Sequence, residues 1–111
     1  MRFEWDEEKN RLNLKRHKIS FETASLVFDD PNAVTIPDRM HDDEEERFIT
    51  LRRLEDIVIL FVVHTDREAD GEEVIRIISA RKATPSERKI YEATQQRTAQ
   101  GYRGTRRNER L

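Results

Sequence analysis

The sequence contains no cysteine, which excludes disulfide bonds, thiolate metal ligands and cysteine nucleophiles. Its longest apolar run, residues 57–63, is far shorter than the roughly 20 residues that a membrane-spanning helix needs. The three glycines form neither a P-loop nor a Gly-rich dinucleotide-binding motif. The charged first residues lack the apolar segment of a signal peptide. For a chain of 111 residues, these absences predict a single-domain, soluble, cytoplasmic protein that contacts no membrane.

Histidine is also scarce, and its spacing does not suit a metal site. His17, His41 and His64 stand far apart in the sequence. None belongs to a pair at helical spacing or to the H-E-x-x-H pattern of zinc enzymes. A Ser-His-Asp order of the kind used by hydrolases is absent as well. We therefore expect neither a metal ion nor a cofactor.

Charged side chains are abundant, at 40% of the residues against 35% hydrophobic ones. The net charge of −2 conceals an asymmetry, because residues 97–111 contain five arginines and one glutamate, a net charge of +4. We expect residues 1–96 to form one compact domain and residues 97–111 to be a mobile basic extension. Such an extension attracts RNA in a salt-sensitive manner. The alternative is a solvated terminus without a role.

Helix starts are marked by capping residues. Asp6 and Ser20 are placed to cap the N-termini of two helices. The first of these helices has a thin apolar stripe, formed only by Leu12 and Leu14. Residues 84–87 read Thr-Pro-Ser-Glu, a capping box with proline at the first helical position. This signal predicts a third helix that runs from residue 85 to about residue 100.

Five short stretches predict strands by their apolar residues: 3–5, 34–36, 47–54, 57–63 and 74–80. The fourth is apolar on both faces, which is typical of a central strand, and Phe61 in it is expected in the core. Residues 66–72 are interpreted as a polar connector. The elements follow as one strand, two helices, four strands and one helix. The predicted fold is α+β, with a small antiparallel sheet of about four strands, two N-terminal helices and a C-terminal helix packed on it.

A candidate anion site lies where the last strand meets the last helix. Arg81 closes the strand beside a helix N-terminus, which itself favours anions. Arg88 and Tyr91 are neighbours on the helix at i,i+3 spacing. Together they could bind phosphate, because arginine donates two parallel hydrogen bonds to it. In the alternative arrangement Arg88 pairs with Glu92 and Tyr91 packs on the sheet, and spacing alone does not separate the two.

An ordered set of segments carries a resemblance to a known family. The segments are residues 3–9 (FEWDEEK), 13–22 (NLKRHKISFE), 24–31 (ASLVFDDP), 46–47 (ER), 76–84 (RIISARKAT), 87–88 (ER) and 91–92 (YE). Through them the chain resembles the BrnT ribonuclease toxins of bacterial type II toxin–antitoxin systems. The resemblance implies a RelE-like fold, RNA cleavage without a metal, and neutralisation by a BrnA-type antitoxin. Lys18 and Arg52 stand where the family usually has glycine.

The implied reaction needs a base for the 2′-hydroxyl, donors for the phosphorane charge and an acid for the leaving 5′-oxygen. We assign charge stabilisation to Arg81 and Arg88, with Lys15 as a supporting cation. His17 is the first candidate for the base or acid, since histidine exchanges protons near neutral pH. The reserve candidates are Glu46 and Tyr91.

The expected partners follow from the same resemblance. They are an RNA substrate and an antitoxin that covers Lys15, His17, Arg81 and Arg88 with acidic residues. Operator DNA is expected to bind only through the antitoxin, which also sets the oligomeric state. The rival hypothesis is a non-catalytic interaction module that acts only through its partner in a DNA-binding autoregulatory complex. A third is a toxin that keeps the fold without the activity.

Overall fold

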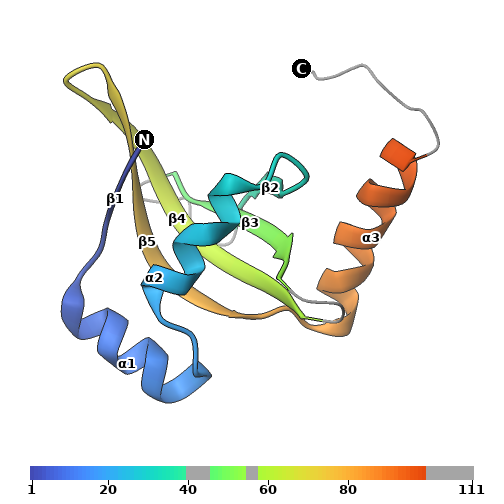
Figure 1. Ribbon diagram of the computed structural model, residues 1–111, viewed down its shortest axis with the longest axis horizontal. Coiled ribbons are helices and arrows are strands. Elements are labelled where there is room, and N and C mark those ends of the chain that lie inside the picture. Colours follow the sequence, from blue (N-terminus) through green and yellow to red (C-terminus); the bar gives the residue numbers. More distant parts are fainter. Residues whose placement is uncertain (40–45, 55–57, 100–111) are drawn as a thin grey trace.

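The computed structural model describes residues 1–39, 46–54 and 58–99 (Figure 1). Their elements are β1 (Arg2–Glu4), α1 (Glu7–His17), α2 (Phe21–Ala24), the 3₁₀ turn η1 (Ser25–Asp29), β2 (Val34–Pro37), β3 (Phe48–Arg53), β4 (Ile59–Ala69), β5 (Glu72–Lys82) and α3 (Pro85–Ala99). The predicted order of strands and helices is confirmed. The predicted boundary after residue 96 falls inside α3, and residues 100–111 lie outside the described part.

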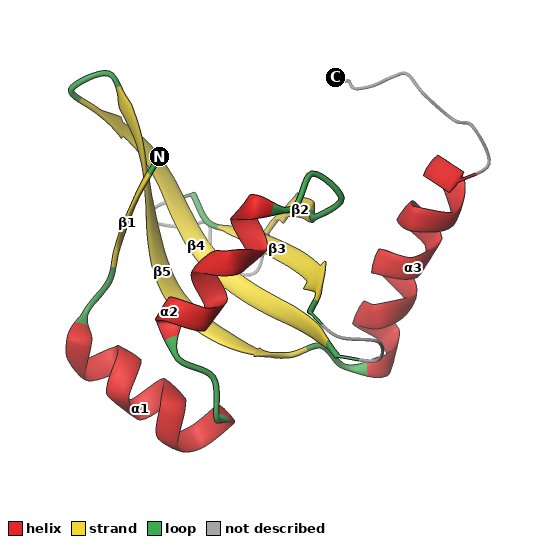
Figure 2. Cartoon of the chain, in the orientation of Figure 1, coloured by secondary structure: helices red, strands yellow, loops and turns green. Residues whose placement is uncertain are grey.

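The sheet has five strands in the order β1-β5-β4-β3-β2, which places β4 at the centre as expected. The prediction of about four antiparallel strands is corrected in one respect. β1 adds to the edge of β5 in parallel, whereas the other pairs are antiparallel. Two helices separate β1 from the other strands, so no hairpin constrains its direction. The sheet is therefore mixed (Figure 2).

The main core lies between the sheet and the N-terminal helices. Phe21, Ala24 and Val27 from α2 and η1 pack against apolar side chains of β4 and β5. A smaller cluster on the opposite face joins Tyr91 of α3 to Leu51 and Ile59. α3 therefore meets that face near the end of β3, and Figure 1 shows it standing to one side of the sheet.

Helix α1 buries amides rather than leucines. Asp6 caps it as predicted, but Leu12 and Leu14 are 43% and 48% exposed, so the expected apolar stripe is wrong. Asn13 is buried, and its Nδ2 donates to the carbonyls of Ile19 (2.9 Å) and Ala80 (2.8 Å). Its Oδ1 accepts from the Ala80 N–H at 3.2 Å. One side-chain amide therefore pairs with the edge of β5 beyond the point where β1 stops.

Asn13→Ala is expected to destabilise the fold by about 2–3 kcal/mol, because the buried N–H and C=O of Ala80 lose their partner. The matched control is Leu12→Ala, in the same helix but exposed, which we expect to cost less than about 0.5 kcal/mol. Urea denaturation of both variants measures the difference. Equal midpoints for the two variants would contradict the role given to Asn13.

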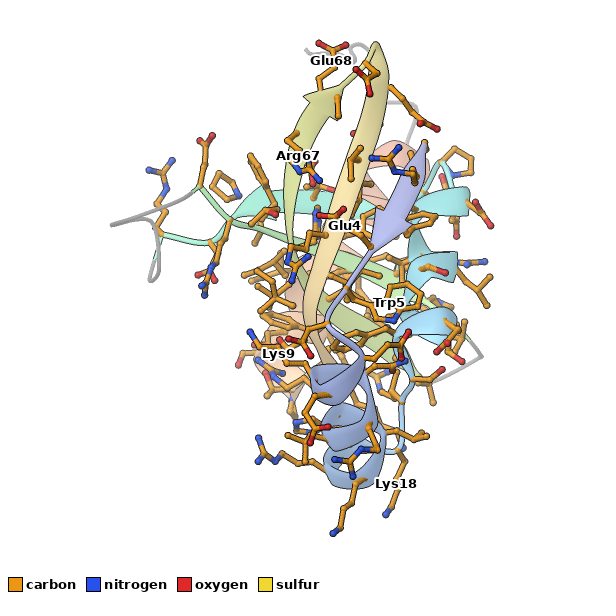
Figure 3. The ribbon with its side chains drawn as sticks, turned by 90° about the vertical axis from the view of Figure 1, so that its left-hand side faces the viewer. Glu4, Trp5, Lys9, Lys18, Arg67 and Glu68 are labelled. Atoms are coloured by element: carbon orange, nitrogen blue, oxygen red, sulfur yellow. The ribbon has the colours of Figure 1, made fainter. Side chains whose placement is uncertain are left out.

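The end of α1 explains one departure from the family. Lys18 adopts a left-handed conformation with φ of 63°, and its N–H donates to the Leu14 carbonyl at 2.9 Å. This is the C-terminal capping position that glycine occupies without steric cost. Lys18 thus adopts the left-handed conformation that glycine adopts more easily at this position. Figure 3 shows Lys18 at the end of α1 that lies away from β1.

The hairpin between β4 and β5 corrects another prediction. Residues 66–72 are not a polar connector, because β4 continues to Ala69 and β5 begins at Glu72. Asp70 and Gly71 alone form the turn, with φ of 56° and 78°. Positive φ at both central residues is the signature of a type I′ turn, which Asp-Gly favours.

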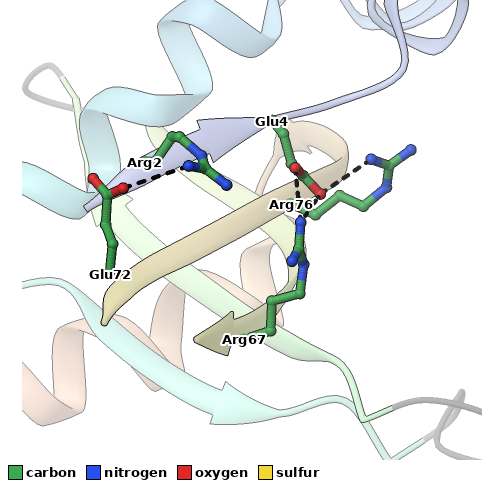
Figure 4. Close-up of polar contacts among 5 residues, drawn as sticks. All are labelled: Arg2, Glu4, Arg67, Glu72 and Arg76. Atoms are coloured by element: carbon green, nitrogen blue, oxygen red, sulfur yellow. Dashed lines mark hydrogen bonds and ion pairs between the residues drawn. The ribbon is translucent and has the colours of Figure 1, made fainter. Parts of the chain in front are cut away.

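Ion pairs of Glu4 hold β1 at the β5 edge of this hairpin (Figure 4). Both carboxylate oxygens of Glu4 accept from Arg67 at 2.9 Å, and Arg76 lies 3.4 Å away. The hydrogen bond from Arg67 holds the pKa of Glu4 below its usual value. The pairing is thus present at neutral pH and is lost in acid as the carboxylate protonates. Phe3, on the other face of β1, packs against Phe28, with ring centroids 5.5 Å apart.

Candidate active site

An open groove lies on the α3 side of the sheet, because α3 covers only part of this face. The groove has a volume of about 470 Å³. Its lining residues are Ile36, Asp38, Ile49, Phe61, Val63, Ser79, Arg81, Glu87 and Ile90. Three strands thus supply a mainly apolar floor, and β5 and α3 supply the charged Arg81 and Glu87 at one side.

Arg81 is held in place from three directions. Its guanidinium lies over the ring of Phe61, with Cζ 3.9 Å from the ring centroid. Nη1 and Nη2 donate to the two carboxylate oxygens of Glu87 at 2.9 and 3.0 Å. Nη1 also donates to the Lys82 carbonyl at 3.2 Å. A ring, a carboxylate and a backbone carbonyl therefore fix a side chain that is flexible when exposed.

Glu87 serves two purposes at once. Its Oε1 accepts from the Thr84 N–H at 2.8 Å, and the Thr84 hydroxyl accepts from the Glu87 N–H at 3.3 Å. These bonds complete the predicted capping box of α3. The hydrogen bonds from Arg81 hold the pKa of Glu87 below its usual value, against the effect of burial. Glu87 thus stays ionised at neutral pH, where it orients Arg81 and is a poor proton acceptor.

Arg81 keeps a second pair of donors for a ligand. The bonds to Glu87 and Lys82 occupy both hydrogens of Nη1 and one hydrogen of Nη2. Nε–H and the remaining hydrogen of Nη2 point in one direction from the rigid guanidinium plane. No acceptor from the described residues is bonded to them. Two parallel donors of this kind match two oxygens of a phosphate.

Arg88 and Tyr91 do not line the groove. Arg88 Nη2 lies 3.5 Å from Glu92 Oε2, which is also 3.9 Å from Arg53 Nη2. Tyr91 is 3% exposed and packs on Leu51, with the Arg53 guanidinium 5.7 Å from its ring centroid. The alternative arrangement for these two side chains, an ion pair with Glu92 and packing on the sheet, is thus the observed one.

The other predicted residues do not line the groove beside Arg81. Lys15 and His17 belong to the last turn of α1, which adjoins the β5 edge of the sheet through Asn13. Glu46 precedes β3 and lines a second hollow of about 270 Å³ with Pro37, Asp38, Arg39 and Arg47. This hollow adjoins the groove, because Asp38 lines both. The structure therefore places Glu46 in a hollow next to the groove, whereas Lys15 and His17 line neither the groove nor the hollow.

Sequence reasoning missed two residues of the groove. Phe61 is half-buried and supports Arg81, so the expectation of a core side chain is corrected. The sequence predicts only the capping-box role of Glu87.

Within the described residues there is no helix long and apolar enough to cross a membrane. The same part of the chain holds no group of three or more His, Cys, Asp or Glu side chains arranged for a metal ion.

The mixed sheet, its helices and the arginine-bearing groove define a small α+β protein of the RelE-like class. Residues 5–87 match the family model for the ribonuclease toxin, BrnT, of type II toxin-antitoxin systems. The crystal structure of the Brucella abortus ribonuclease toxin, BrnT, is similar, with a TM-score of 0.57 and 26% sequence identity over 76% of this chain and 97% of that one. No curated protein sequence matches significantly. The chain belongs to the BrnT family of ribonuclease toxins.

Proposed function

We propose that this chain is a metal-independent endoribonuclease in which Arg81 binds the scissile phosphate of RNA. Family membership supports an RNA substrate and an antitoxin partner. The observation that carries the proposal is the second pair of donors on Arg81, at the edge of an open groove. Preorganised donors stabilise the charge that develops on a phosphorane, because they need no reorganisation during the reaction.

In the proposed reaction the 2′-oxygen attacks the adjacent phosphorus and loses its proton to a base. The 5′-oxygen then leaves with a proton from an acid, which gives a 2′,3′-cyclic phosphate and a 5′-hydroxyl. Arg81 carries most of the charge stabilisation. Arg88 and Lys15 add positive charge at the margins of the site. Tyr91 remains a packing side chain in this proposal, because it is 3% exposed.

Two residues remain as candidates for proton transfer. Glu46 is exposed and lines the hollow that adjoins the groove. His17 carries an imidazole, but it stands in the last turn of α1 and does not line the groove. Cleavage assays with His17→Ala and Glu46→Gln, in EDTA and across a pH series, separate them. We expect the variant that removes the base to flatten one limb of the pH profile and the other to keep it.

The antitoxin acts, in this proposal, by covering the groove. A BrnA-type antitoxin is expected to place an acidic side chain on the second donor pair of Arg81, with charge complementarity speeding the encounter. Lys15, His17 and Arg88 would then be at least partly covered. Binding to operator DNA and the oligomeric state would follow from the antitoxin. Inhibition of cleavage by a complex that leaves Arg81 accessible to RNA would contradict this part of the proposal.

Residues 97–111 are proposed to strengthen RNA binding without taking part in cleavage. Truncation after residue 100 removes four of the five arginines. We expect it to lower the slope of log affinity against log salt by about 2, and to leave the cleavage rate at saturating RNA unchanged. RNA binding at two salt concentrations measures this. An unchanged slope would make the segment a terminus without a role in RNA binding.

A further inference from the structure

We infer that the ends of α1 and β5 form a second phosphate-binding surface, which takes the RNA backbone to one side of the phosphate bound by Arg81. The inference rests on the proposed function and extends it from one phosphate to a stretch of the strand. The surface consists of four exposed cations, which we call the basic patch: Lys15, Arg16, Lys18 and Lys82.

Two elements bring the basic patch together. Asn13 Nδ2 donates to the Ala80 carbonyl at 2.8 Å, so the end of α1 lies beside the end of β5, as Figure 1 shows. Ala80 packs in the main core. Because side chains alternate along a strand, Lys82 points to the side of Ala80, whereas Arg81 between them lines the groove. The basic patch therefore begins one residue beyond Arg81 and continues around the β5 edge to α1.

The cations of the basic patch are not neutralised by the rest of the described chain. Within residues 1–39, 46–54 and 58–99, none of the four side chains forms an ion pair. Acids of the neighbouring elements are bonded to other groups. Glu22 accepts from Asn10 Nδ2 at 3.1 Å, and Glu87 binds Arg81. The patch therefore carries a local positive charge on a chain whose net charge is −2.

Lys18 holds its charge at a position that does not suit a lysine. Its φ of 63° is a conformation that glycine adopts without steric cost. Its Nζ donates to the Lys15 carbonyl at 3.1 Å, which leaves two of the three ammonium hydrogens for phosphate oxygens. The helix dipole favours cations in the last turn of α1, but it explains neither this lysine at positive φ nor Lys82 on a different element. A ligand with repeated negative charge explains both.

The composition of the basic patch favours RNA over an acidic protein as the occupant. Three of its four residues are lysines, which are depleted in protein–protein interfaces. Lysine binds phosphate as a point charge, without a fixed orientation. A strand held at Arg81 carries further phosphates past the end of β5, and each contact there releases counterions. The basic patch is therefore expected to bind the backbone of single-stranded RNA without a base preference.

The test uses the full chain and non-cleavable 2′-O-methyl RNAs of about four and about ten nucleotides, the shorter of which is expected to reach only the groove. Fluorescence anisotropy at several salt concentrations measures binding. The variants are Lys18→Gly alone and the combination of Arg16→Gln, Lys18→Gly and Lys82→Gln. The matched control is Lys9→Gln, an exposed lysine at the opposite end of α1 (Figure 3). Urea denaturation checks the fold of each variant.

The combined variant is expected to lower the slope of log affinity against log salt for the longer RNA by about 2, and its affinity near 0.1 M salt by about 100-fold. Its affinity for the shorter RNA should change less than about twofold, since that RNA does not reach the patch. Lys18→Gly should bind the longer RNA about fivefold more weakly and yet unfold at a higher urea concentration, because glycine relieves the positive φ. Lys9→Gln should change neither affinity.

Unchanged affinity and salt slope for the longer RNA in the folded combined variant would overturn the basic patch and leave the proposed function intact. Equal losses for the shorter and longer RNAs would also overturn it, because the cations would then act at the groove. Loss of antitoxin binding with unchanged RNA binding would assign the patch to the protein partner instead. The expected binding losses in a chain that cleaves no RNA would support the patch and overturn the nuclease.

Discussion

Arg81→Ala is expected to lower kcat/KM for RNA cleavage by about 100- to 1,000-fold, because it removes a preorganised pair of donors from the phosphate. Arg81→Lys should recover little of the rate, since an ammonium keeps the charge but cannot bind two oxygens in the plane of a guanidinium. Steady-state kinetics with a single RNA substrate measure both. Cleavage within a few-fold of wild type by a folded Arg81→Ala protein would remove Arg81 from the site.

The Arg81→Ala variant should remain folded. Arg81 is partly exposed, so solvent screens its ion pair with Glu87. We therefore expect the free energy of unfolding to fall by at most about 1–2 kcal/mol. Thr84 and Glu87 retain the capping box in the variant. A small shift in the urea midpoint, together with a large loss of rate, distinguishes a phosphate ligand from a structural residue.

Phe21→Ala is expected to have the largest effect on stability, about 3–5 kcal/mol. Phe21 is fully buried and meets Trp5 edge-to-face, with ring centroids 6.0 Å apart. A loss of this size is a large share of the stability of a small domain, about 5–15 kcal/mol. Urea denaturation of the purified variant measures it.

Phe61→Ala is the informative comparison. If Phe61 were a core residue, its replacement would reduce stability as much as Phe21→Ala does. Phe61 is only half-buried, so we expect it to cost about half as much stability as Phe21→Ala and to impair cleavage through Arg81. Equal stability losses for the two variants would restore Phe61 to the core.

Local signals in the sequence predicted the starts of the helices well. Asp6, Ser20 and Thr84 cap helices as expected, because a cap depends on residues within three positions of it. The burial of Asn13 was beyond such reasoning. Its partner Ala80 is 67 positions away, and only the packing of α1 on β5 brings the two together.

The register of the β4–β5 hairpin explains why the site was only partly predictable. Counting from the Asp70-Gly71 turn pairs Ala69 with Glu72, and the same count would place Phe61 opposite residue 80. A bulge at Val63 and His64 shifts the pairing by one, so Phe61 faces Arg81 instead. A shift of one residue exchanges the two faces of a strand. The cation–π contact between Arg81 and Phe61 therefore depends on a bulge that no local sequence pattern predicts.

The functional residues differed in the same way. Arg81 was predictable, because a strand end beside a helix start is a local feature. The second role of Glu87 needs the three-dimensional distance to Arg81, since the capping box already accounts for a glutamate at that position. The absence of His17 and Lys15 from the groove was equally hidden, because it depends on how α1 packs along the β5 edge while Arg81 lies over Phe61 in the groove.

The most direct test of the account is to induce this chain alone in a bacterial host, beside Arg81→Ala at a matched soluble level, and to map new RNA 5′ ends. We predict growth arrest and new 5′-hydroxyl ends with the wild type, neither with the variant, and rescue of the wild type by co-expression of its cognate antitoxin. Continued growth with intact RNA at high soluble expression of the wild type would contradict the account.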